Sequence, residues 1–407
     1  MTQTGAQLAA EADHAVVELV RLLRSLCPLA ETGHPVRLPP GPRPVPPPGY
    51  RDAAAVAMYA ARRVGVPLAP PAEPPGPPPG ETHGRLVTDL LRTVLRRPEL
   101  GRVPQDAGAE LDRVIDETAA DTMEGWRSPV VVRSWDGAPL RTYAAGEPDR
   151  PAVVIASACG MPAVLAEAWM RFLAGDRYVV TWETRGLFGA LEPAEVFDTR
   201  ARGVPAQAED LIAVMDRHGV ERAHVMGMCG GAVLALHAAA EYPQRVSALS
   251  LWHGDYELGP DCPKTEHQRN LKALMDMAVD SRSDATAIHA ALRATAMAVV
   301  PQDVAHLVVY PYLAAELFYR YCALTGAIMG ADVAALLGRV QQPSLVVTSA
   351  DDRTAHPAGS HRVAARLRHG ELRVEPHGDH LSVFAAGPRL RDMLVDFLDR
   401  VGSAPTA

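Results

Sequence analysis

The sequence predicts an α/β protein in which a mostly parallel sheet is covered by helices on both faces. Three observations predict this class: short apolar runs without polar alternation, helical periods between those runs, and a turn dipeptide where the pattern begins. Strands that are buried on both faces are nearly continuous apolar runs, and the crossover helices between parallel strands cover the two faces. The 407 residues, 48% hydrophobic and 22% charged, suffice for a core of about 250 residues and an added segment.

Residues 1–125 are predicted to form a helical segment interrupted by prolines. Apolar residues recur at helical spacing from Gln7 to about Leu29, and residues 52–64, 87–95 and 111–123 have the same character. The stretches 39–48 and 67–79 hold most of the 36 prolines. Such runs favour an extended polyproline conformation over packed structure.

The predicted sheet begins at Val130. The β-rich runs 130–135 and 139–144 flank the turn dipeptide Asp136-Gly137, which indicates a hairpin. Further strands are predicted at 152–157, 178–182, 223–227, 246–252, 344–349 and 371–376. In residues 259–337 the apolar residues recur only at helical spacing, without a further strand pattern. This predicts a helical cap inserted between two strands of the core. The chain is therefore divided into an N-terminal segment (1–125), a first core part (126–258), the cap (259–337) and a second core part (338–407).

Composition excludes several functions. The net charge of -8 offers no broad basic field for nucleic acid, and no run reaches the ~18 apolar residues of a membrane span. The N-terminus lacks the pattern of a signal peptide, so we expect a cytoplasmic protein. The cysteines are odd in number and form no C-x-x-C pair, which predicts free thiols, a reducing compartment and no bound metal. They are Cys27, Cys159, Cys229, Cys262 and Cys322.

The strongest local signal is Gly-Met-Cys-Gly-Gly at 227–231, between a predicted strand and a predicted helix. It matches the G-x-S-x-G nucleophile elbow, with the sulfur of Cys229 in place of the serine oxygen. A sharp strand-to-helix turn strains its middle residue, so the flanking positions must be small. The following helix directs its N-terminal dipole at the sulfur and favours thiolate. The alternative is that Cys229 is a small buried apolar residue in a glycine-rich turn.

Two partners for this cysteine follow in the chain order of an elbow enzyme, first an acid and then a histidine. Asp352, after the strand 344–349, is our choice for the acid because it lies one step further into the loop than Asp351, the alternative. His380, in a Gly-x-His setting after the strand 371–376, is preferred as the base over His377. His380 would take the thiol proton, and the aspartate would fix the tautomer of the imidazole. Singly, these residues also suit a solvated turn and a surface histidine.

An oxyanion hole is predicted from backbone N–H groups. Gly230, the residue after the nucleophile, would supply one donor, and Cys159 or Ala158, in the loop after 152–157, would supply the other. That loop lacks the usual His-Gly pair, and packing against the elbow is the alternative for Cys159.

Four residues are candidates for substrate contact. Met228 adjoins the nucleophile, Trp182 ends a predicted strand, and His253 follows the strand after the elbow, at the carboxyl edge where α/β sheets bind ligands. Tyr319 belongs to an aromatic group in the predicted cap that suits a pocket lining for an acyl or aminoacyl group. Loop structure and helical core are the alternatives. Arg185, in Trp-Glu-Thr-Arg-Gly at 182–186, is interpreted as ordering a turn.

From Val130 to its end the chain resembles the α/β-hydrolase superfamily, with elbow, acid and histidine in matching order. The Gly-x-Cys-x-Gly elbow is similar to those of polyhydroxyalkanoate synthases, dienelactone hydrolases and the enzymes that shuttle aminoacyl groups between carrier proteins in nonribosomal peptide or polyketide assembly. Length and the added N-terminal segment favour the last group. This resemblance implies that Cys229 accepts an acyl or aminoacyl group from one phosphopantetheine thiol and passes it to another. The implied partners are acyl or peptidyl carrier proteins, and the protein would need no cofactor of its own.

Thioester chemistry favours the same hypothesis. Exchange of one thioester for another is nearly isoenergetic, and a thioester reacts more readily with a thiol or amine than with water, so cysteine favours transfer over hydrolysis. One alternative is a thioesterase or C–C bond hydrolase that releases an acyl or polyketide product. A second is a non-catalytic binding protein with an inert Cys229. For the N-terminal segment, docking of a carrier protein or of a second subunit in a homo-oligomer stands against a loosely packed appendage.

Overall fold

The chain forms two units. The computed structural model describes residues 3–32, 36–40, 45–71, 82–127, 129–292 and 302–402. The helical unit comprises residues 1–128 and 290–313, and the sheet unit comprises 129–289 and 314–407. Residues 290–313, which the sequence assigns to the cap, thus belong to the helical unit. Parts of the two predicted polyproline stretches, at 41–44 and 72–79, lie outside the described residues.

The sheet unit is built on an eight-stranded sheet of order β10-β9-β8-β7-β5-β6-β4-β3. The five pairings among β5 to β10 are parallel, whereas β4 is antiparallel to β3 and β6. The predicted α/β class with a mostly parallel sheet is therefore confirmed, as is the hairpin that opens it. The strands are β3 (Val130–Arg133), β4 (Pro139–Ala145), β5 (Ala152–Ala156), β6 (Tyr178–Trp182), β7 (Ala223–Met228), β8 (Val246–Trp252), β9 (Ser344–Ser349) and β10 (Gly370–Glu375).

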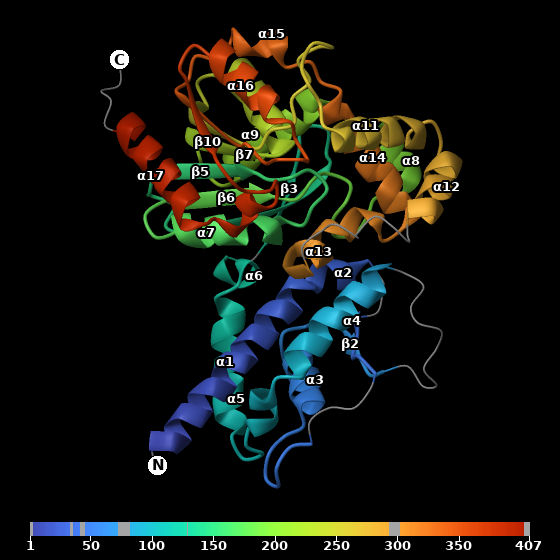
Figure 1. Cartoon of the computed structure of the whole chain (residues 1–407), viewed down its shortest axis with the longest axis vertical. Helices are drawn as coiled ribbons and strands as arrows, with labels where there is room; N and C mark the ends of the chain where they lie inside the picture. The colour runs from blue at the N-terminus through green and yellow to red at the C-terminus, as the bar shows by residue number, and fades with distance from the viewer. Residues whose placement is uncertain are drawn as a thin grey trace. The chain divides into compact units, whose positions relative to one another are not determined.

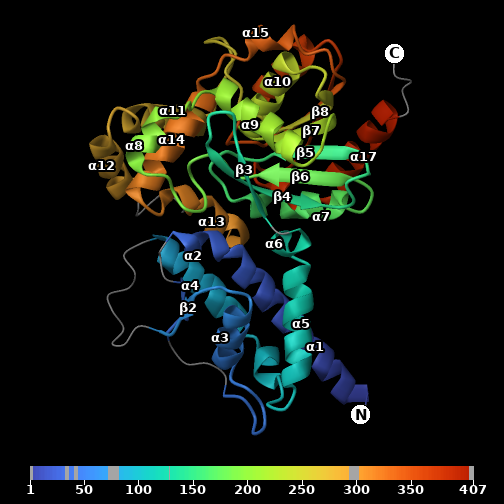
Figure 2. The ribbon, with the colours of Figure 1, turned by 180° about the vertical axis from the view of Figure 1, so that it is seen from behind.

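Helices cover both faces of this sheet (Figures 1 and 2). One face carries α9 (Val204–Arg217), α10 (Gly231–Glu241) and α16 (Pro357–Arg366), and the other carries α7 (Glu167–Leu173) and α17 (Pro388–Gly402). This double cover explains why the central strands lack polar alternation: Val179, Val225 and Leu249 have no exposed surface. The unit also contains α8 (Ala194–Thr199) and the 3-10 turns η2 (Ala163–Ala166) and η4 (Ser382–Ala385).

The cap of the sheet unit consists of α11 (Glu266–Ala278), α12 (Arg282–Leu292), α14 (Ala315–Met329) and α15 (Ala334–Leu337). A capping box of Thr265 and Gln268 starts α11, which packs on α14. Helix α14 covers the elbow, because the Cγ2 atom of Ile328 lies 3.3 Å from where a Cβ on Gly230 would stand. The cap thereby positions the apolar side chain of Ile328 against Gly230, the residue next to Cys229.

The helical unit packs around the amphipathic helix α1 (Gln3–Ser25), whose Leu19 and Leu23 are fully buried together with Leu91 of α4. Its helix α13 belongs to the returning segment, and the His306 Nε2 and Ser25 Oγ atoms lie 3.0 Å apart. The other elements are α2 (Cys27–Glu31), β1 (Val36–Arg37), α3 (Ala53–Arg63), β2 (Leu68–Ala69), α4 (Thr82–Leu95), η1 (Pro98–Arg102), α5 (Gly108–Ala120), α6 (Met123–Trp126), α13 (Gln302–Val308) and η3 (Tyr310–Tyr312).

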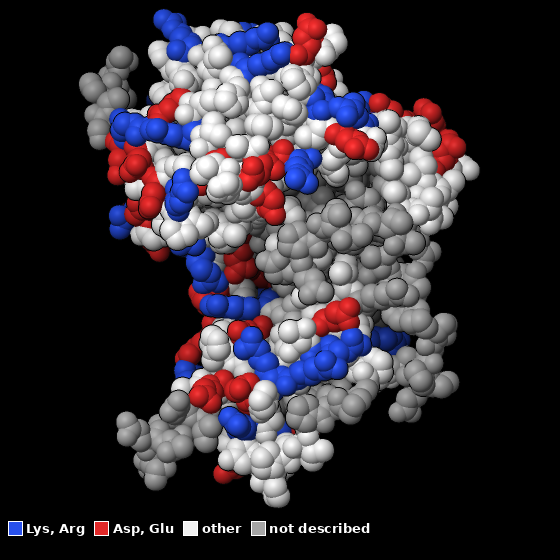
Figure 3. Space-filling model, viewed as in Figure 1, with Lys and Arg blue, Asp and Glu red and all other residues white. Residues whose placement is uncertain are grey.

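The surface of the sheet unit mixes charges of both signs. Figure 3 shows basic and acidic side chains interspersed over the visible face of this unit. Within the part of the chain that the structure describes, no helix combines the length and the apolar character needed to cross a bilayer.

Candidate active site

The turn between β7 and α10 holds Cys229 in a left-handed backbone conformation, with φ 53°. Side-chain-bearing residues seldom adopt this region, and a strained residue at this point projects its side chain away from both elements. The Cys229 N–H donates to the carbonyl of Trp252, with an N···O distance of 2.9 Å. A Cβ on Gly231 would lie 1.9 Å from the carbonyl oxygen of Ala156, so only glycine fits there. The glycines of the motif thus let α10 start close against β5 and β7.

Asp352 and His380 lie together beside this elbow. The Nδ1 atom of His380 is 3.0 Å from Oδ2 of Asp352, and both residues are buried. The other carboxylate oxygen accepts the N–H groups of Thr354 and Ala355 at 2.8 and 2.9 Å. Burial works against the charge, but the hydrogen bonds from His253 and His380 lower the pKa of Asp352 well below its usual range. The carboxylate is therefore ionised and fixes the His380 tautomer with a proton on Nδ1.

His380 is coupled electrostatically to the sulfur of Cys229. Burial alone would lower the pKa of His380, yet the negative charge of Cys229 and the hydrogen bond with Asp352 raise it well above its usual value. The Nε2 atom of His380 is buried and has no oxygen or nitrogen partner among the described residues. The three side chains together suit a thiolate–imidazolium pair held by a carboxylate.

The two alternatives, Asp351 and His377, form a separate pair. Their Oδ2 and Nδ1 atoms are 3.0 Å apart, but the side chains are 57% and 88% exposed. The structure therefore sorts the four predicted residues into one buried pair and one solvated pair.

His253 occupies a position that the sequence analysis did not anticipate. It has no exposed surface, and its Nδ1 atom is 2.9 Å from the same Oδ2 atom of Asp352. The sequence predicts substrate contact here, whereas the structure places the ring on the acid. The available signal was topological: His253 follows β8, and Asp352 follows its neighbour β9.

These three side chains also bear on metal binding. Among the described residues, His253, Asp352 and His380 are the one group of three or more His, Cys, Asp or Glu residues whose ligand atoms all lie within 4.8 Å of one another. Because the carboxylate is ionised, both Nδ1 atoms act as donors to it. In this state neither Nδ1 has a lone pair for a metal ion.

Comparison with known proteins agrees with this architecture. No family model matches the sequence. The chain is 28% identical over 274 residues to "Putative carbamate hydrolase RutD" of Variovorax paradoxus strain S110, covering 66% of this chain and 98% of that protein. It is 27% identical over 177 residues to L-allo-isoleucyltransferase of Pseudomonas savastanoi pv. glycinea, covering 43% and 62%.

Among solved structures, the enol-lactonase of Burkholderia xenovorans LB400 aligns with a TM-score of 0.53 and 19% identity over 66% of this chain and its own full length. The esterase of Exiguobacterium antarcticum aligns with a TM-score of 0.52 and 14% identity, covering 67% and 99%. The sheet unit has the α/β-hydrolase fold.

In the sheet unit, two of the residues predicted for the oxyanion hole are neighbours, because the Cβ atom of Cys159 lies 3.9 Å from where a Cβ on Gly230 would stand. Gly160 is unavailable because its N–H donates to Thr184 Oγ1 at 2.9 Å. Within the described ranges, no group accepts the N–H of Gly230, Ala158 or Cys159. The thiol of Cys159 itself is buried, which raises its pKa to about 11 although hydrogen bonds with Thr325 and Thr184 oppose this. The Cys159 thiol is therefore protonated at neutral pH.

The remaining candidates for substrate contact have packing positions. Met228 is fully buried at the end of β7. Trp182 and Cys159 line a cavity of about 20 Å³, which holds about one water molecule and no acyl group. Tyr319 packs against Phe197 at a ring distance of 6.5 Å and under the Arg282 guanidinium at 4.3 Å. For these three residues the structure provides packing roles.

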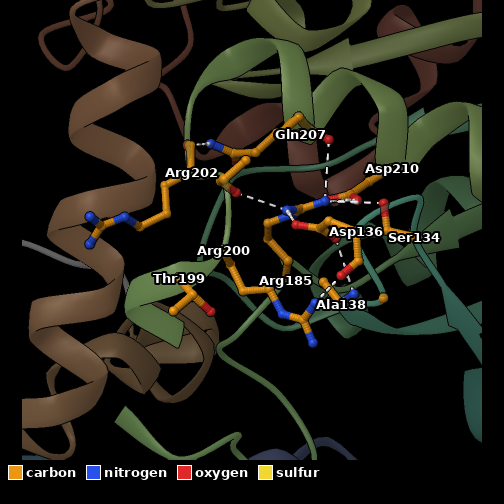
Figure 4. A network of polar contacts seen from close by, with 12 residues as sticks. Ser134, Asp136, Ala138, Arg185, Thr199, Arg200, Arg202, Gln207 and Asp210 are labelled. Carbon is orange, nitrogen blue, oxygen red and sulfur yellow. Dashed lines mark hydrogen bonds and ion pairs between the residues drawn. The ribbon is translucent and has the colours of Figure 1, made fainter. Parts of the chain in front are cut away.

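Arg185 organises the end of β6 (Figure 4). Its guanidinium is 2% exposed, pairs with both oxygens of Asp210 on α9, and reaches Asp136 in the β3–β4 turn at 2.8 Å. Three elements are thereby tied together, and every donor faces protein. This arrangement agrees with the interpretation of Arg185 as a turn-ordering residue.

Proposed function

We propose that the protein is an acyl- or aminoacyltransferase that carries a thioester-bound group between the phosphopantetheine thiols of carrier proteins, through a thioester on Cys229. The observation that carries the proposal is the grouping of Cys229, held at φ 53° in the elbow, with the buried pair His380 and Asp352, whose Nδ1 and Oδ2 atoms lie 3.0 Å apart. A thiolate paired with an imidazolium attacks a thioester carbonyl without prior proton removal.

The first half-reaction loads the enzyme. The Cys229 thiolate attacks the carbonyl carbon of the donor thioester, and the negative oxygen is stabilised by the N–H groups of Gly230 and of Ala158 or Cys159. The bond from that carbon to the phosphopantetheine sulfur then breaks. His380 gives its proton to the departing thiolate, which leaves a neutral imidazole and an acylated Cys229.

The second half-reaction reverses these events with another thiol. Neutral His380 takes the proton of the acceptor thiol, whose sulfur attacks the Cys229 thioester. Cys229 leaves as a thiolate and the thiolate–imidazolium pair is restored. Substrate and product are both thioesters, so little free energy is lost and the direction follows concentration.

The relatives support two versions of this chemistry. The L-allo-isoleucyltransferase is named as an aminoacyl-transferring enzyme, in agreement with transfer. The likeness to a protein named as a carbamate hydrolase, over nearly that protein's full length, supports a thioesterase or other hydrolase in which water replaces the acceptor thiol. Cysteine in the elbow favours transfer, because a thioester reacts more slowly with water than with a thiol.

Intact-protein mass spectrometry tests the proposal. After incubation with an acyl- or aminoacyl-loaded carrier protein, we expect a mass increase equal to the group, located on Cys229 and lost when a second holo carrier is added. Free acid appearing instead of the loaded second carrier would establish the hydrolase alternative. If no loaded carrier protein gives either an adduct or free acid, the result would indicate a non-catalytic protein.

Two variants make this experiment specific. Cys229→Ala is expected to abolish the adduct, whereas Cys27→Ala, which alters a thiol of the helical unit, is expected to retain it. Cys229→Ser is expected to shift the products toward hydrolysis, because an oxygen ester lacks the thioester's preference for thiols. Unchanged products in the serine variant would contradict the role of sulfur.

A further inference from the structure

Two histidines share one oxygen of the candidate triad acid. Nδ1 of His253 and Nδ1 of His380 lie 2.9 and 3.0 Å from Oδ2 of Asp352, and the rings meet edge to face at 5.8 Å and 89°. With the two backbone N–H groups on Oδ1, the carboxylate accepts four hydrogen bonds. All four lone pairs of the carboxylate therefore accept a hydrogen bond. The negative charge of Asp352 is shared among these donors, so only a part of it stabilises the proton on His380.

The backbone holds His253 in this place against its own preference. The residue has φ 48°, in the left-handed region, and its N–H donates to the carbonyl of Val347 on β9 at 2.9 Å. A non-glycine residue in this conformation is strained, and such strain persists where the surrounding structure imposes it. The turn after β8 thus directs the imidazole toward the loop that carries Asp352.

His253 faces Asp352 through its Nδ1 atom. Its Nε2 atom is buried and has no partner in the described part of the chain. Because an ionised carboxylate can only accept, His253 donates its Nδ1–H to Oδ2 of Asp352. His253 therefore competes with His380 for the same carboxylate oxygen.

We propose that His253 is a positioning residue that weakens His380 as a general base, by drawing on the carboxylate of Asp352, and so favours thiol over water as the acceptor. The proposal rests on the thioester intermediate of the proposed function. In that intermediate the sulfur is acylated and bears no charge, so the basicity of His380 depends on Asp352.

The two acceptors differ in their need for a base. A thiol has a pKa near 8.5 and attacks as a thiolate that forms with little help, whereas water, with a pKa near 15.7, must lose its proton to the base during attack. A weaker base consequently slows hydrolysis more than transfer. Sharing the carboxylate protects the thioester without blocking thiol attack.

Other titratable groups also face this cluster and must be left unchanged by the test. His267 on α11 has a lowered pKa, caused by burial and by the positive charge of His380. Tyr256 is buried after β8 and has a raised pKa, caused by burial and by the charges of Cys229 and Asp255. Substitutions at His253 remove none of these groups.

The experiment compares His253→Leu with His253→Asn. Leucine fills much of the space without a donor, whereas the amide of asparagine places an N–H near the position of Nδ1, and asparagine tolerates left-handed backbone. The probes are the acetyl thioester of N-acetylcysteamine as donor and pantetheine as acceptor thiol. Mass spectrometry measures acetate and acetyl-pantetheine. His253→Gln, whose amide reaches the Nε2 position instead, is a second variant without the donor should the leucine variant not fold.

We expect the ratio of acetate to acetyl-pantetheine to rise about tenfold in the leucine variant and to stay within twofold of wild type in the asparagine variant. The pH at which hydrolysis reaches half its maximum should move upward in the leucine variant, because His380 becomes more basic. An unchanged ratio and pH profile, with both rates lowered equally, would show a merely structural role and overturn the inference. Absence of an adduct on Cys229 of the wild type would instead overturn the proposed function, and this inference with it.

Discussion

Two histidine–aspartate pairs occupy the same two loops of the sheet unit and share one geometry. The Nδ1–Oδ2 distance is 3.0 Å in both His380–Asp352 and His377–Asp351. The side chains of the first pair are 6% and 0% exposed, and those of the second are 88% and 57% exposed. Equal hydrogen-bond lengths therefore do not make the pairs equivalent.

Burial and a third partner separate the two pairs. Water screens the exposed pair, whereas the low dielectric around the buried pair strengthens every charge interaction there. His380 also interacts with the charge of Cys229, which raises its pKa. The comparison teaches that the surroundings of a histidine–aspartate pair set its electrostatic strength, and the predictions below test this difference and the activation of Cys229.

The largest effect is expected from His380→Ala. Loss of the base leaves the Cys229 thiol without its imidazolium, so the rate of acyl loading should fall about 10³-fold or more. Time-resolved mass spectrometry of the adduct measures this rate. A loss below tenfold would show that another group activates the sulfur.

The next effect is expected from Asp352→Asn. The amide cannot accept from two imidazoles as a carboxylate does, so loading should fall about 10²-fold and the free energy of unfolding should fall by about 3 kcal/mol. The folded-state pKa of Asp352 is lowered, so its contribution to stability is present above the usual value of 3.8 and is lost as the pH falls toward the folded-state pKa.

Urea unfolding of wild type and Asp352→Asn at several pH values checks this sign. The stability difference between the two proteins should be largest near neutral pH and should shrink as the pH is lowered below about 4. A difference that grows on acidification would contradict an ionised, stabilising carboxylate.

A smaller effect is expected among the thiols. Burial raises the pKa of Cys27 and of Cys322 to about 12, so both are protonated at neutral pH. Iodoacetamide should label Cys229 at least about tenfold faster than either, as measured by peptide mass spectrometry. Equal and slow labelling of all three would remove the basis for an activated nucleophile.

The smallest effect is expected from the exposed pair. His377→Ala and Asp351→Asn should change acyl loading less than about twofold and the free energy of unfolding by less than about 0.5 kcal/mol, because solvent screens this pair. These variants are the matched controls for His380→Ala and Asp352→Asn. A large loss of loading in either would mean that exposure does not distinguish the two pairs.

Several features of the site were predictable because their causes are local. The elbow was visible in five adjacent residues, since the glycines around Cys229 are required by backbone contacts such as that between Gly231 and Ala156. The central strands were visible because burial on both faces leaves continuous apolar runs. Asp352 and His380 were chosen because they follow the elbow in the chain order of acid and then histidine, each in a loop after a predicted strand.

Other features depend on distant parts of the chain. His253 and Asp352 are 99 residues apart, and nothing near His253 in the sequence reveals that its ring turns toward the acid. Residues 290–313 continue the helical pattern of the cap, yet they belong to the helical unit. Helical periodicity predicts that one face of a helix is apolar, but it does not predict which other helix packs against that face.

The sequence by itself determined the α/β class, the elbow around Cys229 and the loops that bear the acid and the histidine. These depend on sterics and burial patterns that neighbouring residues encode. Only the tertiary structure decided which aspartate meets which histidine, and that a second imidazole shares Asp352. Adjacent residues of one loop point into different environments, and the dielectric that gives a carboxylate its strength is set by the packing of the whole unit.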